Sequence, residues 1–190
     1  MKSLITTTLF AATIATASYA EPANYTLDAS HSQIIFSYDH LGFSTTYGMF
    51  SGFEGDIVFD ADAPEKSSVT VSMPASSMFT GWERRDGHFL SPDLINAAAN
   101  EIVSFTSTSI EVTGDDTANI TGDLTFAGVT KPVVLAAKLN KMGPHPRSQK
   151  PWLGFDATTT LLRTDFGVGM AAPFISDEVA IQISIEAEGS

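Results

Sequence analysis

The sequence predicts an all-β fold, an antiparallel barrel or sandwich of about eight strands that carries one short helix. Apolar and polar residues alternate with a period of two along most of the chain, as they do in strands that bury one face. Short turns containing Gly or Asp separate these runs, which favours antiparallel neighbours. Helix signals come from Ser91, Pro92 and Asp93, an N-cap, a first-turn proline and an acidic residue, so a helix is expected over residues 91–99.

The expected strands follow one another along the chain, and the apolar set of each is expected to face the interior. In chain order these sets are Ile34, Phe36 and Tyr38; Met49, Phe53, Ile57 and Phe59; Val69, Val71 and Met73; residues 102–112 as one strand or a broken pair; Ile120, Leu124 and Phe126; Val133, Leu135, Ala137 and Leu139; Leu153, Phe155 and Leu161; and Val179, Ile181, Ile183 and Ile185. Residues 141–151, with three Pro and one Gly, are expected to form a mobile loop.

The N-terminus is expected to be a cleaved export signal, residues 1–20. Lys2 precedes a moderately apolar run, and Ser18 and Ala20 place small residues where signal peptidase requires them. The apolar run is shorter than the ~20 residues that span a bilayer. We therefore expect a mature chain that begins at Glu21 outside the cytoplasm, with residues 21–190 forming one domain.

Composition excludes several classes of function. The chain has 22 acidic against 10 basic residues and a net charge of −12, which argues against nucleic acid or an anionic membrane face as the main partner. It contains no Cys, so thiol chemistry and zinc–thiolate sites are excluded. Hydrophobic residues make up 43% of the chain, enough for a sizeable core.

One strand face changes in character along its length. Ile34, Phe36, Tyr38 and His40 share this face, which runs from aliphatic to aromatic to polar. Such a gradient suits a pocket that holds an oily tail inside and a polar head at the rim, and it equally suits a core strand whose end reaches water. An eight-stranded barrel has an interior that side chains just fill or that holds one small ligand, so the pattern leaves both alternatives open.

A set of motifs distinguishes the filled barrel from the barrel that holds a ligand. They are Y-x-L-D-x-x-H-S at residues 25–32, F-x-x-x-H-L-G-F at 36–43, G-x-F at 48–50, R-D-G-H-F-L-S at 85–91, F-x-S-T at 105–108, G-D-L-T-F-x-G-V-T-K at 122–131 and R-x-D-F-G at 163–167. In this order they resemble the YceI-like family of bacterial periplasmic lipid-binding proteins. The family usually has a Phe-rich segment and then Tyr-Pro after the helix, whereas residues 94–96 and 100–101 here are Leu-Ile-Asn and Asn-Glu. A looser cover over the pocket is therefore expected.

The resemblance implies an eight-stranded antiparallel lipocalin-like barrel whose hollow interior binds a long isoprenoid amphiphile. It implies a periplasmic carrier of a polyprenyl phosphate, an isoprenoid quinone or a related lipid. The partners expected are that lipid and a membrane donor or acceptor protein, with a homodimer left open. No cofactor is expected, since a quinone would enter as a ligand. A hydrolase or isomerase acting on a hydrophobic substrate in the same pocket is the alternative.

Two groups of side chains are the candidate ligand-binding residues. The tail would contact Ile34, Phe36, Tyr38, Phe53, Ile57, Val71, Phe105, Leu124, Phe126, Leu135, Phe155, Leu161, Ile181 and Ile183. The head group would lie at the rim with His40, Trp82, Arg84, Arg85 and His88.

The rim arginines have two interpretations, since adjacent guanidinium groups bind a phosphate or pair with neighbouring carboxylates. Arg163 and Asp165 are expected to form a structural pair that fixes a loop. No catalytic residue and no metal site is expected, because His31 and His40 lie on opposite phases and no G-x-S-x-G turn frames a nucleophile.

Overall fold

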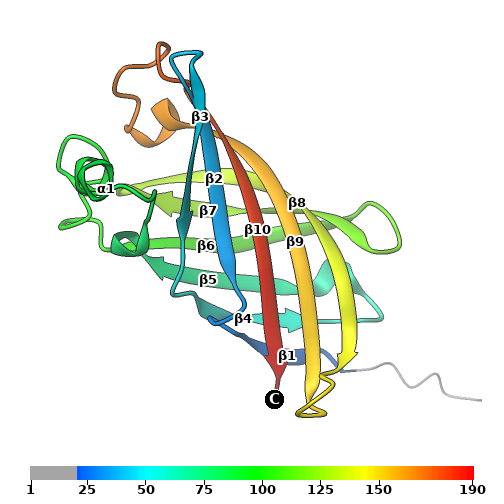
Figure 1. Ribbon diagram of the computed structural model, residues 1–190. Coiled ribbons are helices and arrows are strands. Elements are labelled where there is room, and N and C mark those ends of the chain that lie inside the picture. The colour runs from blue at the N-terminus through cyan, green and yellow to red at the C-terminus, as the bar shows by residue number, and fades with distance from the viewer. Residues whose placement is uncertain (1–20) are drawn as a thin grey trace, which may run out of the picture.

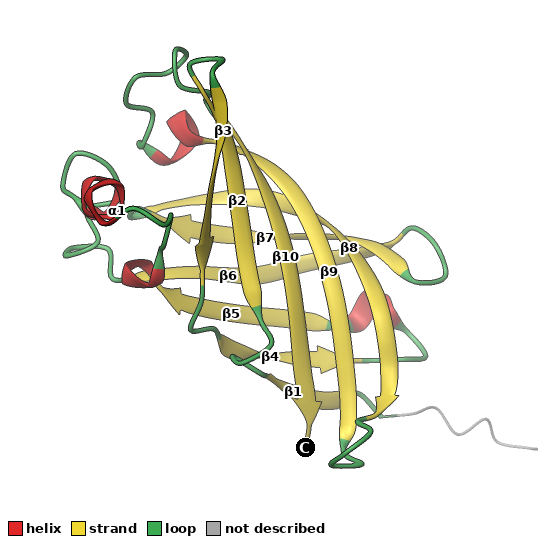
Figure 2. Cartoon of the chain, in the orientation of Figure 1, coloured by secondary structure: helices red, strands yellow, loops and turns green. Residues whose placement is uncertain are grey.

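The computed structural model describes residues 21–190 (Figure 1), and the expected export signal, residues 1–20, lies outside them. The strands are β1 (Ala23–Leu27), β2 (Gln33–His40), β3 (Ser44–Phe50), β4 (Glu54–Phe59), β5 (Ser68–Pro74), β6 (Ile102–Val112), β7 (Thr117–Phe126), β8 (Val129–Pro144), β9 (Pro151–Leu162) and β10 (Glu178–Gly189). The helix α1 (Glu83–Leu90) is accompanied by three 3-10 turns, η1 (Pro64–Lys66), η2 (Ala75–Ser77) and η3 (Arg163–Phe166). Figure 2 shows how far strands dominate the molecule.

Eight strands close a ring in the order β1-β4-β5-β6-β7-β8-β9-β10 and back to β1, and every neighbouring pair is antiparallel. This confirms the predicted eight-stranded antiparallel barrel with one short helix. The hairpin β2–β3 is additional, and it extends the wall from the edge of β10. β10 uses one edge for two neighbours, since residues 180–184 pair with β2 and residues 187–189 pair with β1.

The predicted position of the helix is wrong. α1 ends at Leu90, and residues 91–99 form turns instead. Ser91 lies just after the helix with an extended backbone (ψ 164°), as a residue before proline prefers, and its hydroxyl donates to the carbonyl of His88 (2.7 Å). The Ser-Pro-Asp signal therefore marks the end of a helix. Between residues 21 and 190, no helix combines the length and apolarity that crossing a bilayer requires.

Two further boundaries differ from the prediction. The run from Met49 to Asp60 is broken, because Gly52 (φ 71°) turns the chain between β3 and β4. The expected loop over residues 141–151 shrinks to residues 145–150, since β8 and β9 pair up to Pro144 and Pro151. Proline is tolerated there because Pro144 is the last residue of β8 and Pro151 is the first residue of β9.

Packing is uneven along the barrel. Phe53 and Leu153 are almost completely buried and anchor a hydrophobic core. In contrast, inward residues such as Leu124, Leu135 and Ile183 stay only half-buried, although they lie on the inner phase of central strands. Side chains therefore do not fill the interior.

Gly122 tests how tightly the strands pack at one point. A Cβ at this position would lie 2.4 Å from Cζ of Phe105 and 2.5 Å from the carbonyl oxygen of Thr106, which is backbone and cannot give way easily. We expect Gly122→Ala to lower the free energy of unfolding by about 1–3 kcal/mol, as overpacking does. Urea unfolding followed by tryptophan fluorescence measures it.

Gly154→Ala is the matched control, because Gly154 also lies in a strand and a Cβ there would meet no atom within 4 Å. Its unfolding free energy should change by no more than about 0.5 kcal/mol. Equal effects of the two substitutions would contradict the close approach of β6 to β7.

Candidate functional site

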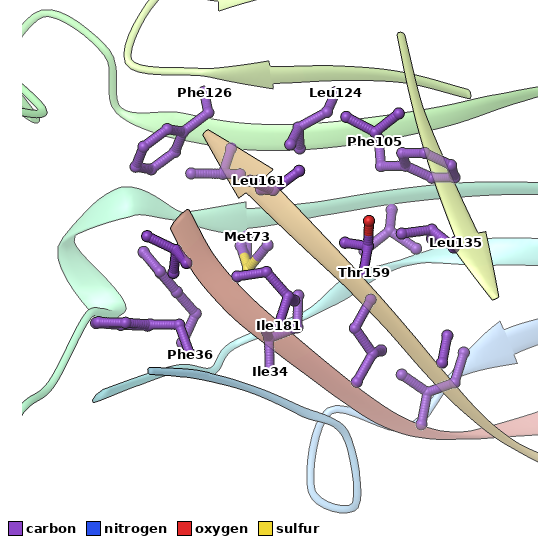
Figure 3. Close-up of a pocket in the computed structure, with 18 of the residues that line it drawn as sticks. Ile34, Phe36, Met73, Phe105, Leu124, Phe126, Leu135, Thr159, Leu161 and Ile181 are labelled. Atoms are coloured by element: carbon purple, nitrogen blue, oxygen red, sulfur yellow. The ribbon is translucent and has the colours of Figure 1, made fainter. Parts of the chain in front are cut away.

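A cavity of about 1020 Å³ occupies the barrel interior, and β2 to β10 all contribute to its wall. Figure 3 shows labelled side chains from several strands, among them Ile34, Leu124 and Ile181, turned toward this space. The volume is at the upper end of the range typical of small-molecule sites, ~300–1,000 Å³. Apolar side chains dominate the wall, so the cavity suits an apolar occupant.

Every residue predicted to contact the lipid tail lies in the cavity wall. This agreement follows from the period-two alternation, which is a local property of each strand. Contact of these residues with a lipid tail stays a prediction.

Sequence reasoning missed some residues of the wall. Phe50 faces the cavity, whereas Met49 faces outward and forms a β-bridge with Phe79. The error arose because the turn at Gly52 resets the alternation between β3 and β4. Phe166, on η3 beyond the end of β9, was missed because no strand pattern covers it.

Four phenylalanine rings form a continuous row near one end of the cavity. Ring centroids lie 5.8 Å apart for Phe36 and Phe50, 6.5 Å for Phe50 and Phe126, and 5.9 Å for Phe126 and Phe166. Gly48 makes room for Phe36, because a Cβ at Gly48 would lie 2.2 Å from the ring. The row combines rings from separate strands and from η3, so only the closed barrel assembles it.

The end of the cavity beside α1 is called the mouth here, and all five predicted rim residues line it. His40 ends β2, and Trp82 precedes α1. Arg84, Arg85 and His88 lie within α1 itself, because the helix begins at Glu83 and not at residue 91, where the sequence predicted its start. Leu94 and Ile95, from the segment that follows α1, also line the cavity, and Ile95 is buried.

The two arginines of α1 differ in their surroundings. Arg85 donates from Nε to the hydroxyl of Thr80 (2.8 Å) and from Nη2 to the carbonyl of Thr80 (2.7 Å), and its guanidinium lies 5.9 Å from the ring centre of Trp82. Arg85 thus fastens the segment before α1, through Thr80 and not through a carboxylate. The side chain of Arg84 is exposed and makes no hydrogen bond or ion pair with any of residues 21–190, which leaves its charge available to a ligand.

The opposite end of the cavity is acidic. Asp115 and Asp116 line it from the turn between β6 and β7, far from α1 along these strands (Figure 1). Asp116 lies 3.8 Å from Nζ of Lys138. Because guanidinium groups line one end and carboxylates the other, an anionic head group is favoured at the mouth.

Outside the cavity, Asp28, His31 and Glu186 gather side-chain ligand atoms within 4.8 Å of one another, the arrangement in which a metal ion would be held. The atoms are already engaged: Nδ1 of His31 lies 2.6 Å from Oδ2 of Asp28, and Trp152 donates to Glu186 (2.7 Å). Hydrogen bonds from Ser30 and His31 lower the pKa of Asp28, and the bond to Asp28 raises the pKa of His31.

Asp28, Ser30 and His31 do not have the geometry of a catalytic triad. Ser30 and Asp28 contact the same ring nitrogen of His31, Nδ1, at 3.0 and 2.6 Å, whereas a triad needs the serine and the carboxylate on different nitrogens. The hydroxyl of Ser32 also donates to the carbonyl of Asp28 (2.7 Å). The contacts therefore close the loop between β1 and β2.

Arg163 fixes a loop, as predicted, but with other partners. Its guanidinium donates to the carbonyls of Val168 (2.8 Å), Ile175 (2.9 Å) and Ser176, within the loop of residues 167–176. The carboxylate that helps is that of Asp177 and not that of Asp165. Asp177 accepts from the amide and the hydroxyl of Thr164, and these hydrogen bonds lower its pKa.

Comparisons with known proteins agree with this geometry. A family model described as a YceI-like domain matches residues 25–187. A UPF0312 protein of Ectopseudomonas mendocina is 41% identical over 173 residues, which cover 88% of this chain and 88% of that protein. The crystal structure of a Campylobacter jejuni YCEI protein superposes with a TM-score of 0.73 at 27% identity and covers 80% of this chain and 90% of that one.

A second solved structure is more distant in sequence. It is a polyisoprenoid binding domain from Saccharophagus degradans implicated in plant cell wall breakdown, with a TM-score of 0.68 and 15% identity. The match covers 90% of this chain and 100% of that domain. At this identity the likeness shows a shared fold alone.

Proposed function

The chain belongs to the family of YceI-like domains, and on that premise we propose that it binds a long-chain isoprenoid amphiphile in its cavity and carries it across the periplasm. A polyprenyl phosphate and an isoprenoid quinone are the ligands that fit this proposal. The membership confirms the resemblance that the ordered motifs predicted.

One observation carries the proposal: the apolar inner face of the barrel encloses about 1020 Å³ without filling it. Leaving apolar surface in contact with water costs about 25 cal/mol per Å². A hydrophobic occupant removes that cost, whereas water finds few partners on such a wall. A long flexible hydrocarbon tail fits better than a compact polar molecule.

Other features support the details. The Saccharophagus degradans domain, named for polyisoprenoid binding, has the same fold, which supports an isoprenoid as the ligand. The expected export signal supports transport in the periplasm. Binding without turnover is supported because the Ser-His-Asp contacts found among residues 21–190, at Asp28 to His31, lie away from the cavity and share one ring nitrogen.

Lipid extraction tests the proposal directly. Protein purified from its native host without detergent should release an isoprenoid lipid into organic solvent, identified by mass spectrometry. Delipidated protein should then rebind a polyprenyl phosphate or an isoprenoid quinone. If no lipid is extracted and neither ligand binds, the proposed function is wrong.

Phe126 distinguishes a ligand-lined wall from a packed core. Phe126 is half-buried in the cavity wall, where its ring packs against those of Phe50 and Phe166. In a packed core, Phe→Ala would cost about 3–5 kcal/mol of stability. We expect Phe126→Ala to cost the delipidated protein distinctly less, because part of the ring already faces empty space, and to weaken isoprenoid binding.

Leu153→Ala is the matched control for Phe126→Ala. Leu153 is 0% exposed and does not line the cavity. The Leu153→Ala variant should therefore lose about 2–5 kcal/mol of unfolding free energy, with unchanged ligand affinity. Denaturant unfolding and ligand titration of both variants provide the measurements. If Phe126→Ala lost the full ~3–5 kcal/mol of stability expected in a packed core and kept its affinity for the isoprenoid, side chains would fill the barrel interior.

Arg84 reports on the head group. If the ligand carries a phosphate or pyrophosphate, Arg84→Ala should weaken binding by about 1.5–3 kcal/mol, the worth of a charged hydrogen bond. If the ligand is a quinone, the same substitution should reduce the binding free energy much less. Arg147→Ala is the control, because Arg147 lies in the exposed loop of residues 145–150 and does not line the cavity. Equal affinity of wild type and Arg84→Ala for both head types would remove Arg84 from the site.

A further inference from the structure

Two loops beside the mouth expose large apolar side chains. They are the turn of residues 41–43 between β2 and β3 and the loop of residues 167–176, together called the mouth loops (Figure 2). Phe43 is 89% exposed and Phe174 is 77% exposed, while Leu41 and Met170 are about half-exposed. Single exposed apolar residues are ordinary in soluble proteins, but a group of them beside a ligand site indicates an interaction surface.

The two loops lie next to each other. His40 forms a β-bridge with Ile175, and the amide of Ser176 donates to the carbonyl of Asp39 (3.1 Å). Figure 1 shows both at the same end of the molecule, beyond the ends of β2 and β9. Their exposed side chains therefore form one surface.

From this surface we propose that the mouth loops insert into the apolar boundary of a lipid bilayer and so set the mouth against the membrane. The inference rests on the proposed function, since a bilayer is where an isoprenoid amphiphile resides. It adds the place and manner of membrane contact.

The loops hold these side chains outward. Arg163 fixes the longer loop through four of its carbonyls, those of Val168, Met170, Ile175 and Ser176. In the turn, the amide of Phe43 donates to the carbonyl of His40 (3.1 Å), and the amide of Gly42 donates to the carboxylate of Asp39 (2.7 Å). Met170 and Ile175 line the apolar cavity, yet Phe43 and Phe174 stay outside it. The loops thus present one side to the cavity and the other to the surroundings.

Charge points to a bilayer as the occupant. Residues 41–53 and 166–176 contain no charged residue, although the chain as a whole has 22 acidic residues and a net charge of −12. The inserted residues themselves therefore carry no carboxylate, and the flanking carboxylates of Asp39 and Asp177 lie at the bases of the loops, where they accept hydrogen bonds from Gly42 and Thr164. Arg84 and His88 line the mouth. The acidic composition of the chain as a whole is thus absent from the loop residues that would enter the bilayer.

A second copy of the chain fits the surface less well. Stable dimers bury about 800 Å² per partner, more than four apolar side chains at two loop tips provide. The tips instead project, as membrane anchors do, with an aromatic side chain on each. The surface is also continuous with the mouth, so insertion would open a path from the bilayer into the cavity.

Vesicle flotation tests the inference with delipidated wild type and the double variant Phe43→Ser, Phe174→Ser. The probes are vesicles of phosphatidylcholine and vesicles of phosphatidylethanolamine with phosphatidylglycerol. We expect the double variant to lose at least about tenfold in partition to both, since burying one Phe side chain is worth that much. Val134→Ser with Met142→Ser is the control, because both residues are 50% exposed on β8 and neither lines the cavity.

Isoprenoid binding in solution separates this inference from the proposed function. Neither Phe43 nor Phe174 lines the cavity, so the double variant should bind a dispersed polyprenyl phosphate or quinone as wild type does, while its uptake from vesicles slows. Equal partition of wild type and both double variants would overturn membrane insertion. It would also be overturned if wild type were a dimer that the Phe substitutions dissociate without changing partition. Loop-dependent partition without isoprenoid binding would uphold insertion and refute the proposed cargo.

Discussion

The divided edge of β10 is the constraint on which the cavity depends. One edge of β10 pairs with β9 over residues 178–188, and the other is shared between β2 and β1. Where β10 meets β1, side chains pack closely, and Leu153 and Ala187 are fully buried. Where β10 meets β2, the inserted hairpin enlarges the wall, and inward residues such as Ile181 and Ile183 remain only half-buried.

This arrangement lets a stable protein keep an unfilled interior. The backbone hydrogen bonds of a closed ring satisfy one another with no free edge in the ring, so stability does not require side chains to fill the centre. Within the described part of the chain, no buried side-chain nitrogen or oxygen lacks a hydrogen-bond partner. The apolar inner face can therefore serve a ligand.

The mouth is organised differently from the barrel. Its segments bury a few apolar side chains, among them Ile95 and Phe166, and two guanidinium groups also hold them. Arg85 bonds to Thr80 before α1, and Arg163 bonds to carbonyls of residues 167–176. Charge-assisted bonds to backbone oxygens position a loop with few contacts. Arg84, the neighbour of Arg85 along α1, keeps its charge available at the mouth.

The sequence by itself determined the strands, the residues of the inner face and the family, because alternation along a strand and ordered motifs are local features. It misplaced α1, since Ser91 and Pro92 suit either end of a helix, and it missed Phe50, since the phase of β3 depends on the turn at Gly52. Only the tertiary structure decided that the barrel is hollow and that residues 41–43 and 167–176 share one surface. Both depend on how distant strands pair around β10, and the pairing of distant strands leaves no trace in the alternation of any one of them.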